Sequence, residues 1–370
     1  MRIPRSTARV ASLLAVAAAA LAGVTGTAAA GPPPAAAVYT LSNAVAGNTV
    51  LAYDRAADGS LTAAGSFATG GTGTGGGLGS QGAVVLSDNG RFVFAVNAGS
   101  NDVSALAVRP AALELADKVP SGGTQPISLS VHGKLLYVLN AGSPANITGF
   151  HVTHDGSLEQ LAGSTQSLSG PAVGPAEVAF SPDGETLVVT EKGTNKIDLF
   201  RVGNDGRAGA ATTHASSGTT PFGFDFDRRG NLIVSEAFGG TASALSSYAI
   251  TGTGLGIISA SVAATGQKAA CWVVVSKNGR YAYTTNTATG TVSVYAIDRD
   301  GSLTLINAVA TTVGGSPLDV SISGDGRFLY VLNGVNHSID AFAIAHDGTL
   351  TPIVGGVSGL VTGTNGLAAS

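Results

Sequence analysis

The residues best suited to chemistry in this sequence lie directly after short apolar segments. Glu191 and Lys192 follow the segment 186–190, and Glu236 follows the segment 232–235. A carboxylate can act as a general base that activates water, and a lysine ammonium can stabilise a developing oxyanion. Glu191, Glu236 and Lys192 are therefore the candidates for catalytic residues in a hydrolytic reaction.

Asparagine takes the equivalent position in four other parts of the chain, at Asn97, Asn140, Asn286 and Asn333. Such residues end strands by capping loop amides, or they form a ring of polar side chains around a small ligand. Trp272 is a candidate stacking platform for a ring-shaped ligand, although its neighbour Cys271 is typical of an inert core. The four asparagines and Trp272 are the candidates for ligand binding.

No combination of residues indicates a metal ion or a cofactor. His132, His154 and His346 fall in predicted turns, and none of the six histidines has the i, i+4 spacing of a helical metal site. The glycine-rich stretch 71–76 lacks a following helix and a Gly-Lys-Ser/Thr sequence, so we interpret it as a mobile loop. We therefore expect neither a metal nor a cofactor.

The first 30 residues are typical of a signal peptide. Three arginines within residues 1–9 precede the apolar stretch 10–24, and residues 28–30 are alanines that suit a cleavage site. Residues 31–37 form a Pro/Ala spacer, and cleavage after residue 37 is the alternative. We expect a secreted or extracytoplasmic protein with no membrane span in its mature form.

The charge and the cysteine content exclude two classes of interaction. The formal net charge is −4, and loss of the three arginines in the predicted signal peptide shifts it to −7. This weak acidic charge gives no electrostatic case for nucleic acid as a partner. Cys271 is the single cysteine, so the chain forms no internal disulfide and depends on burial and hydrogen bonding for its stability.

The candidate residues belong to an internal repeat. Counting the polar residue that ends each apolar segment, from Asn43 to Asn333, gives seven units spaced by 43 to 54 residues. This spacing is the size of one four-stranded propeller blade. With 53 glycines and β-branched alternation between turn signals, the sequence predicts an all-β fold: a single seven-bladed β-propeller of four-stranded antiparallel blades over residues 38–370.

The count of turns predicts how the ring closes. We label the strands of each unit a to d, from the inside outward. Seven b strands are accompanied by six tight a–b turns, because the first unit begins at strand b. The C-terminal segment 365–370 resembles an a strand with no b strand after it, so we expect it to pair beside residues 38–43. A large residue that recurs once in each c strand, such as Phe150 or Tyr295, is predicted to pack between blades.

The alternating strand directions separate two faces of the propeller. Tight a–b and c–d glycine turns lie on one face, here called the turn face. The candidate residues and the long connections 70–82, 163–174 and 261–269 lie on the opposite face, the loop face. Long loops on a rigid scaffold commonly form binding sites, so we expect the site at the channel mouth on the loop face.

The units resemble the lactonase-type seven-bladed propellers, the family of 6-phosphogluconolactonase and carboxymuconate cyclase. The resemblance depends on S-P-D-G-E-T-L-V-V-T, S-K-N-G-R-Y-A-Y-T-T-N and S-G-D-G-R-F-L-Y-V-L-N, followed by D-G-S-L or D-G-T-L, and covers residues 38–370. It implies a His-Pro-His run entering an a strand, with Glu and Arg near the channel. Here the entries read Gly174-Pro175-Ala176, Thr220-Pro221-Phe222, Ala269-Ala270-Cys271 and Ser316-Pro317-Leu318, without histidine.

These observations lead to a hypothesis with two alternatives. The leading hypothesis is an exported, monomeric binding or scaffold module that lacks the family's catalytic histidine and binds a small molecule or an envelope component. The first alternative is a hydrolase or cyclase that acts on an unphosphorylated lactone or sugar acid at the loop-face channel mouth. The second is a protein-interaction platform, which requires an exposed apolar loop face.

Overall fold

The computed structural model describes residues 1–2, 36–252 and 254–370. The predicted signal peptide and most of the predicted spacer lie outside the described residues. From residue 36 onward the described chain consists of strands and loops, with one 3₁₀ turn, η1 (Phe238–Gly240). Among these described residues no helix is long and apolar enough to cross a membrane.

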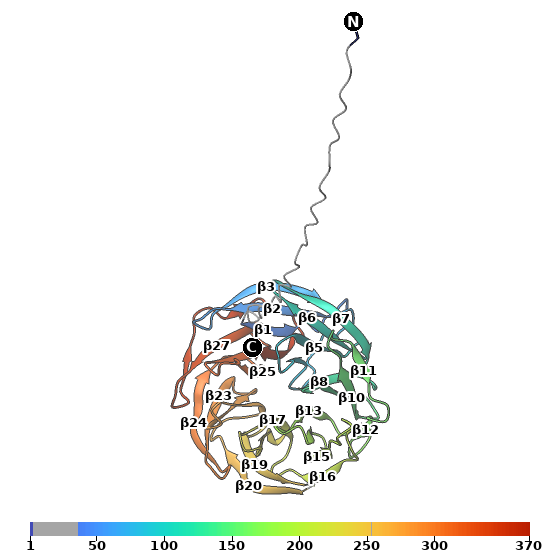
Figure 1. The fold of residues 1–370 in the computed structure, drawn as a ribbon. Helices are drawn as coiled ribbons and strands as arrows, with labels where there is room; N and C mark the ends of the chain where they lie inside the picture. The colour runs from blue at the N-terminus through green and yellow to red at the C-terminus, as the bar shows by residue number, and fades with distance from the viewer. Residues whose placement is uncertain (3–35, 253) are drawn as a thin grey trace. The chain divides into compact units, whose positions relative to one another are not determined.

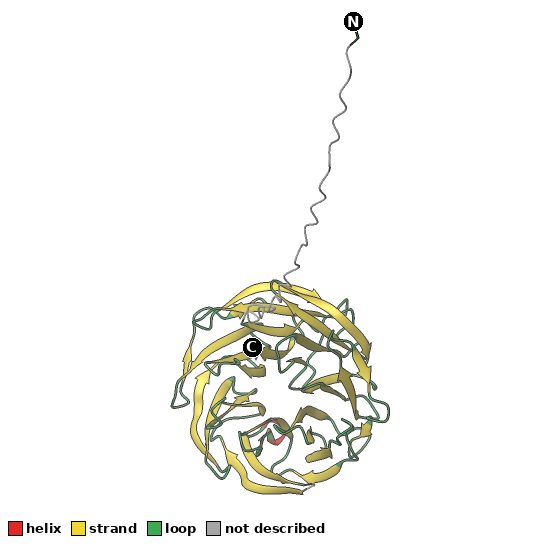
Figure 2. Cartoon of the chain, viewed as in Figure 1, coloured by secondary structure: helices red, strands yellow, loops and turns green. Residues whose placement is uncertain are grey.

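Seven β-sheets surround one axis, which confirms the predicted seven-bladed propeller (Figures 1 and 2). From the innermost strand outward, blade 1 contains β30 (Asn365–Ala369), β1 (Ala37–Leu41), β2 (Thr49–Arg55) and β3 (Leu61–Ala68), and blade 2 contains β4 (Val84–Leu86), β5 (Phe92–Asn97), β6 (Asp102–Arg109) and β7 (Ala112–Pro120). Blade 3 contains β8 (Pro126–His132), β9 (Leu135–Asn140), β10 (Asn146–Val152), β11 (Leu158–Gln160) and β12 (Gln166–Ser167).

The remaining blades follow the same order. Blade 4 contains β13 (Pro175–Phe180), β14 (Thr186–Glu191), β15 (Lys196–Arg201) and β16 (Thr212–Ala215), and blade 5 contains β17 (Pro221–Phe226), β18 (Leu232–Glu236), β19 (Ala244–Thr251) and β20 (Gly254–Ala263). Blade 6 contains β21 (Ala270–Val275), β22 (Tyr281–Asn286), β23 (Thr291–Ile297) and β24 (Leu303–Thr312). Blade 7 contains β25 (Pro317–Ile322), β26 (Phe328–Asn333), β27 (Ser338–Ile344), β28 (Leu350–Pro352) and β29 (Val357–Ser358).

The tight turns have the backbone conformation that their glycines predict. Gly184, between β13 and β14, has a φ of 73°, and Gly206, between β15 and β16, has a φ of 79°. This left-handed conformation is accessible to glycine at little cost, and it reverses the chain within a short hairpin. The turns therefore set the register that places one face of each strand against the next blade.

The C-terminal strand closes the ring as predicted. Strand β30 pairs antiparallel with β1, and Figure 1 shows the C-terminus on the inner side of β1. The Thr40 hydroxyl donates to the Gly366 carbonyl over 2.6 Å, and the Ser370 amide donates to the Ala37 carbonyl over 2.9 Å. Blade 1 is thus assembled from both ends of the described propeller.

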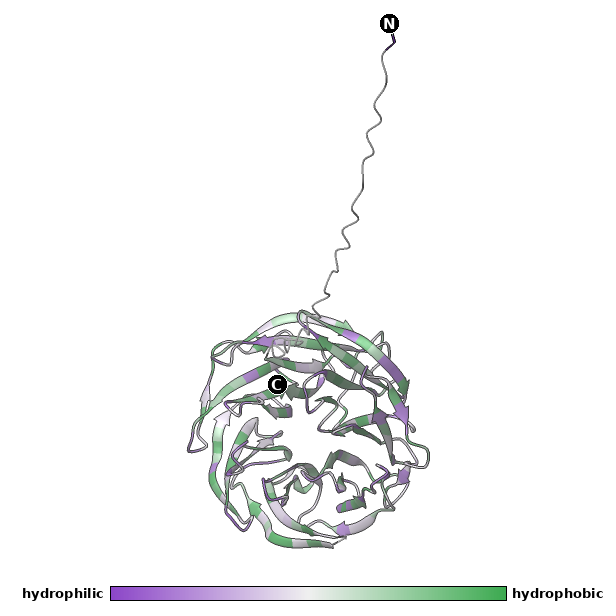
Figure 3. Ribbon diagram, in the orientation of Figure 1, coloured by the Kyte–Doolittle hydropathy of each residue, from purple (hydrophilic) through white to green (hydrophobic). Residues whose placement is uncertain are grey.

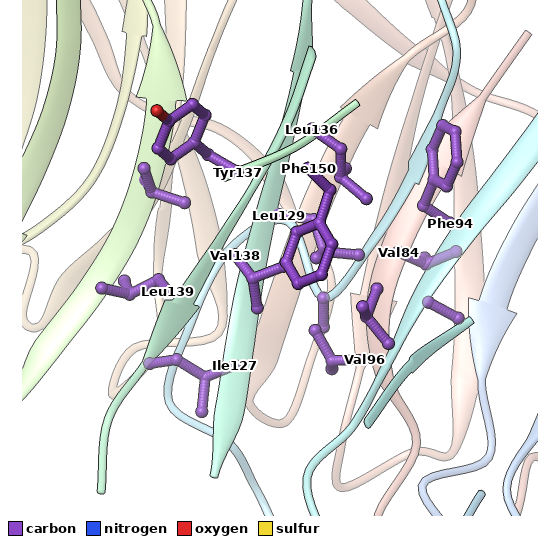
Figure 4. Close-up of a cluster of buried hydrophobic side chains, with 14 of the residues drawn as sticks. Val84, Phe94, Val96, Ile127, Leu129, Leu136, Tyr137, Val138, Leu139 and Phe150 are labelled. Atoms are coloured by element: carbon purple, nitrogen blue, oxygen red, sulfur yellow. The ribbon is translucent and has the colours of Figure 1, made fainter. Parts of the chain in front are cut away.

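Large side chains fill the space between blades. Phe150 of β10 lies beside Leu129 and Val138 of its own blade and near Val84 and Val96 of blade 2 (Figure 4). In Figure 3 hydrophobic colour runs along the strands, while the outermost strands mix hydrophobic and hydrophilic residues. The seven recurring c-strand residues are buried, which confirms their predicted core role: Tyr53, Leu106, Phe150, Phe200, Tyr248, Tyr295 and Phe342.

Two of the predicted loops differ from expectation. The connection 261–269 is shorter than predicted, because β20 continues to Ala263 and pairs with β19 up to that residue. The glycine-rich stretch 71–76, predicted as a mobile loop, is hydrogen-bonded to residues 43 and 44. The Gly73 amide donates to the Ala44 carbonyl over 2.8 Å, and Asn43 Nδ2 donates to the Gly76 carbonyl over 2.7 Å.

Candidate functional site

The loop-face mouth of the channel is covered by the chain itself. Residues 78–82, at the end of the connection between blades 1 and 2, cross this mouth and are here called the roof. Ser80 Oγ donates to the Ile127 carbonyl of blade 3 over 2.7 Å, and the Gln81 amide donates to the Ala176 carbonyl of blade 4 over 3.2 Å. Because Leu78, Ser80 and Gln81 are buried, the roof is part of the folded core.

Lys192 holds the roof from the rim of blade 4. Its ammonium donates to the Gly79 carbonyl and lies 4.6 Å from the centre of the Phe222 ring. Burial lowers the pKa of Lys192 to about 8, against a small opposing effect of Cys271. The Lys192 ammonium therefore binds a carbonyl and an aromatic ring of the chain itself. A catalytic role would require the same ammonium to contact a developing oxyanion.

Glu191 belongs to a buried network within blade 4. Its Oε2 accepts hydrogen bonds from the Ser169 and Thr194 hydroxyls, and its Oε1 accepts from the Ser169 amide over 3.0 Å. Burial acts to raise its pKa, but the hydrogen bonds from Ser169, Thr194 and Asp198 together hold it below the usual value. Burial, followed by the hydrogen bond and the charge of Glu191, raises the pKa of Asp198 to about 7.

Glu236 has a separate set of partners in blade 5. Its Oε1 accepts from the Ser246 hydroxyl over 2.6 Å and from the Gly218 amide over 2.7 Å, and its Oε2 accepts from the Ser261 hydroxyl over 2.6 Å. Glu236 is 0% exposed, as is Glu191. The two carboxylates therefore do not converge on one water molecule or ligand, and each ties loops of its own blade to the end of strand b.

The four asparagines proposed for ligand binding lie in the same setting. Asn97 Oδ1 accepts from the Thr69 hydroxyl over 2.7 Å, and its Nδ2 donates to Ser104 Oγ over 2.8 Å. Asn333 Nδ2 donates to the Val313 carbonyl over 3.0 Å. Asn140 and Asn286 likewise donate to groups of their own blades, and all four are 0% exposed. Their geometry favours the capping of loops over a ring around a ligand.

Trp272 and Lys192 are brought together on Phe222. The Trp272 ring meets Phe222 edge-on, with 4.9 Å between ring centres, and only 3% of Trp272 is exposed. Its neighbour Cys271 is buried, and burial raises the pKa of this thiol to about 11, so the thiolate form is suppressed. Trp272 is therefore packed beneath the roof, and neither face of its ring is open for stacking on a ligand.

Below the roof, the seven innermost strands surround a cavity of about 430 Å³, here called the central channel. Gln81 and Gly82 of the roof line its closed end, and the exposed residues Asp88 and Lys277 line its other end, at the turn face. Along β25, Asp319 is 0% exposed, whereas Ser321 nearer the turn face is partly exposed. The channel therefore opens at the turn face, opposite to the expected mouth.

Besides Asp88 at the turn-face end, three acidic residues line the central channel: Glu177 of β13, Asp225 of β17 and Asp319 of β25. Two of them accept hydrogen bonds from the inner strand of the next blade. Glu177 Oε2 accepts from the Phe224 amide, and Asp225 Oδ2 accepts from the Val275 amide, each over 2.7 Å. An innermost strand has no sheet neighbour on its channel side, so these carboxyls satisfy amides that would otherwise be unpaired.

Burial favours the neutral form of these three carboxyl groups. It raises the pKa of Asp319 to about 8 and that of Glu177 well above its usual range, with the charges of Asp225 and Asp319 adding to the effect at Glu177. It also raises the pKa of Asp225. Asp319 Oδ1 accepts from the Val320 amide over 2.7 Å, and the backbone amides of Val320, Leu367 and Gly82 act against the effect of burial on the pKa of Asp319.

This arrangement determines what the channel can bind. A neutral carboxylic acid both donates and accepts hydrogen bonds, so it suits hydroxyl groups and lactone oxygens. Apolar side chains such as Val84, Leu129 and Val274 cover other parts of the wall. A cavity of this volume, lined by both apolar side chains and convergent polar groups, is suited to a small molecule.

Sequence reasoning did not identify these channel acids, although a signal was present. Glu177 and Asp319 each lie two residues after the proline that begins an inner strand, where blade 3 has Ser128. A charged residue inside a predicted buried strand is unusual and marks a position with a specific partner.

Within the described residues, no group of three or more His, Cys, Asp or Glu side chains is arranged to hold a metal ion.

Comparison with known proteins identifies what this fold and channel are similar to. The model of the family described as "Lactonase, 7-bladed beta-propeller" matches residues 37–173, 163–253 and 240–358. A 6-phosphogluconolactonase of Yersinia pestis (strain Pestoides F) is 23% identical over 124 residues, which are 32% of this chain and 37% of that protein. The alignment thus spans little more than a third of the curated relative.

Solved structures are similar over nearly the whole chain. The periplasmic gluconolactonase of Pseudomonas aeruginosa has a TM-score of 0.69 at 19% identity, covering 90% of this chain and 99% of that one. A protein from Lactobacillus plantarum has a TM-score of 0.72 at 17% identity, covering 91% and 99%. At these identities the similarity establishes the fold alone.

Proposed function

The chain belongs to the lactonase family of seven-bladed β-propellers, and from this premise we propose that it is an exported binding module for a small, uncharged, polyhydroxylated molecule held in the central channel. The observation that supports this most is that the carboxyl groups of Glu177, Asp225 and Asp319 line the channel and that burial raises the pKa of each. In their neutral form these groups can both donate hydrogen bonds to and accept them from the hydroxyl groups of such a molecule.

The charge of the channel favours an uncharged ligand. Besides Asp88 at the turn-face end, the acidic groups of the wall are the three buried carboxyls, and Lys277 is the one lysine or arginine among the described lining residues. A phosphate group would lose its hydration in this buried part of the channel without a cation beside it, and burying an unpaired charge is costly. An unphosphorylated lactone or a sugar would avoid this cost.

A binding role is also consistent with the loop face. Glu191, Glu236 and Lys192 are each occupied by groups of the chain, and the roof fills the mouth that they surround. We propose in addition that the catalytic histidine implied by the family resemblance is missing, since no inner-strand entry carries His-Pro-His. Export is supported by the predicted signal peptide and by the similar structure described as a periplasmic gluconolactonase.

A binding measurement tests this proposal. Calorimetric titration of the protein with an unphosphorylated aldonolactone and its open-chain polyol is expected to show binding, whereas the phosphorylated lactone binds at least about tenfold more weakly. Asp319→Leu keeps the number and branching of the side-chain heavy atoms and removes both oxygens, so it is expected to abolish binding. Asp347→Asn, in an exposed c–d turn, is the control. Equal affinity in wild type and Asp319→Leu would place the ligand elsewhere.

The second candidate function is hydrolysis or cyclisation of an unphosphorylated lactone or sugar acid. It is favoured by family membership and by the pKa of about 8 for Asp319, because a general acid–base works best near the operating pH. Acid release from a lactone panel measures it. Turnover lost in Asp319→Leu would assign catalysis to the channel, and turnover lost in Glu191→Gln with unchanged folding would assign it to the loop face.

A further inference from the structure

Four arginines surround a hollow on the turn face, between blades 5 and 6: Arg228, Arg229, Arg280 and Arg299. The hollow has a volume of about 720 Å³, and its lining includes Tyr281 and Ile306. All four arginines are exposed, and Asp298 is the one acidic residue among the described residues that line it. This concentration of positive charge stands against a chain whose formal net charge is −4.

These four guanidinium groups differ from the other arginines in their pairing. Arg55, Arg109, Arg201 and Arg207 each form an ion pair with a nearby carboxylate, at N–O distances of 2.7 to 3.5 Å. Across the described part of the chain, no ion pair involves the four arginines of the hollow. Arg91 and Arg327 also lack an ion pair within the described residues, but each donates to a backbone carbonyl, whereas the four arginines of the hollow are left available to an external anion.

The repeat itself explains why Arg280 is available. Arg91, Arg280 and Arg327 occupy the same position, directly after the glycine of an a–b turn. Arg91 donates to the His154 carbonyl and Arg327 to the Ala57 carbonyl, each over 3.2 Å, and each carbonyl lies in the c–d turn of the next blade.

In blade 6 a tyrosine takes over this contact. Tyr281 stands where the other two blades have phenylalanine, Phe92 and Phe328. The Tyr281 hydroxyl donates to the His346 carbonyl over 3.4 Å, the carbonyl equivalent to those that the other arginines bind. Arg280 makes no such bond within the described residues, although it lies over the adjacent Tyr281 ring, 5.6 Å from its centre, as the other two arginines lie over their phenylalanines.

The turn of blade 5 is modified so that it can carry two arginines. In four other blades, a serine and an Asp or Asn two residues later close the a–b turn, for example Ser276 and Asn278. In blade 5, Asp227 performs both tasks, accepting from the Arg229 and Asn231 amides over 2.7 and 2.9 Å. Position 229 is therefore free for an arginine, and the Asp227 carboxylate is fully occupied.

The stem of Arg228 is fixed against the neighbouring blade. A Cβ atom added to Gly279 would lie 2.7 Å from Arg228 Cγ, which shows how closely the stem packs on that glycine. Lys277 packs on Gly326 of the following blade in the same way, at 3.0 Å. This contact directs Arg228 toward blade 6, where Arg280 and Arg299 also line the hollow.

We propose that this hollow is a second binding site, for a small polyvalent anion that carries two or more phosphate or carboxylate groups. The guanidinium group presents paired donors that match both kinds of oxyanion, and several such groups around one hollow select for more than one negative charge. Tyr281 and Ile306 provide contact for the uncharged part of the ligand. The site is separate from the central channel, with which it shares no lining residue.

Calorimetric titration with inorganic pyrophosphate and with citrate, at low and at moderate ionic strength, tests the proposal with the whole chain. Wild type is expected to bind at least one of the two probes, more weakly as salt increases. The double variant Arg228→Gln/Arg280→Gln is expected to bind at least about tenfold more weakly, because each lost charged hydrogen bond contributes on this order. The matched control is Arg91→Gln/Arg327→Gln, which changes the same turn position in two other blades.

A third variant tests the tyrosine's role. Tyr281→Phe recreates the arrangement of blades 2 and 7, so Arg280 is expected to bind the His346 carbonyl and anion affinity is expected to fall several-fold. Equal weakening in the control pair would indicate nonspecific attraction to a charged surface and would overturn the proposal, as would the absence of binding to both probes. Neither result bears on polyol binding in the central channel, so the two sites are tested independently.

Discussion

Gln81 and Val273 form a two-point contact between the roof and blade 6. Gln81 Nε2 donates to the Val273 carbonyl over 2.8 Å, and the Val273 amide donates to Gln81 Oε1 over 3.2 Å. This pairing imitates the hydrogen bonds between neighbouring strands and ties the connection of blades 1 and 2 to the far side of the channel. The roof is therefore held at several points around the channel mouth.

Replacement of Lys192 by methionine is expected to loosen the roof without unfolding the propeller. The variant keeps the stem on Phe222 but removes the donor to the Gly79 carbonyl. Hydrogen exchange of the amides of residues 79–82 is expected to accelerate severalfold, with a small change in melting temperature. Lys196→Met is the control, because Lys196 contacts Ser169 instead. Equal exchange in Lys192→Met and wild type would contradict the role of Lys192.

Asp319 is expected to make stability depend on pH in a direction opposite to a salt-bridged acid. Its folded pKa is about 8 and its usual value 3.8, so between these pH values the folded state retains a proton that the unfolded state has lost. Wild-type stability should therefore fall as pH rises through this window, by at most about 1.4 kcal/mol per pH unit for one proton.

The comparison with Asp319→Asn isolates this effect. The asparagine does not titrate, so the melting temperature of Asp319→Asn minus that of wild type is expected to increase steadily from pH 5 to pH 8. Glu191 has a lowered pKa and contributes stability that is lost as pH falls from its usual value of 4.5 through its folded value, so the opposite trend is expected for Glu191→Gln only below about pH 4.5. A difference for Asp319→Asn that is independent of pH would contradict the raised pKa.

Glu236→Gln is expected to lower stability. The carboxylate accepts from the Ser246 and Ser261 hydroxyls and the Gly218 amide, and glutamine presents a donor to at least one of them. Loss of a charged hydrogen bond in a buried setting costs about 2 kcal/mol. Denaturant unfolding measures the cost, with the exposed Glu159→Gln as a control. Unchanged stability would point away from a structural role.

Deletion of residues 364–370 is expected to destabilise the propeller by about 3 kcal/mol or more. It removes β30, with the buried side chain of Leu367, and leaves the inner edge of β1 unpaired. Thermal unfolding monitored by circular dichroism measures the loss. Val361→Ser, at an exposed position nearby, controls for changes in this region. A melting temperature equal to that of the full chain would show that the closing strand is dispensable.

The fold could be predicted from the sequence because its information is local and repeated. An apolar alternation such as Thr186–Glu191, bounded by a glycine turn, specifies one strand, and the repetition of this pattern specifies the blade count. Closure followed from one missing strand and one surplus segment. These inferences need no knowledge of how distant loops pack.

The site depends on packing that the repeat does not encode. The position of Glu191 at a strand end was visible, but its burial depends on Ser169, which a separate connection brings over it. The roof also arises from a connection that departs from the repeat. The repeat pattern therefore did not predict that the loop-face mouth of the channel is covered. Asp319 occupies the same position in its inner strand as Ser128 in blade 3. The repeat therefore does not show that Asp319, unlike Ser128, lines the central channel.

The pairing of β30 with β1 has a consequence for the order in which the molecule is made. The partner of the first strand is synthesised after the rest of the described propeller, so blade 1 lacks its inner strand until residues 365–369 arrive. Contacts between residues so far apart in the chain form slowly, because a long loop must first be closed. Until then, the exposed edge of β1 is a natural target for chaperones and a marker of an unfinished molecule.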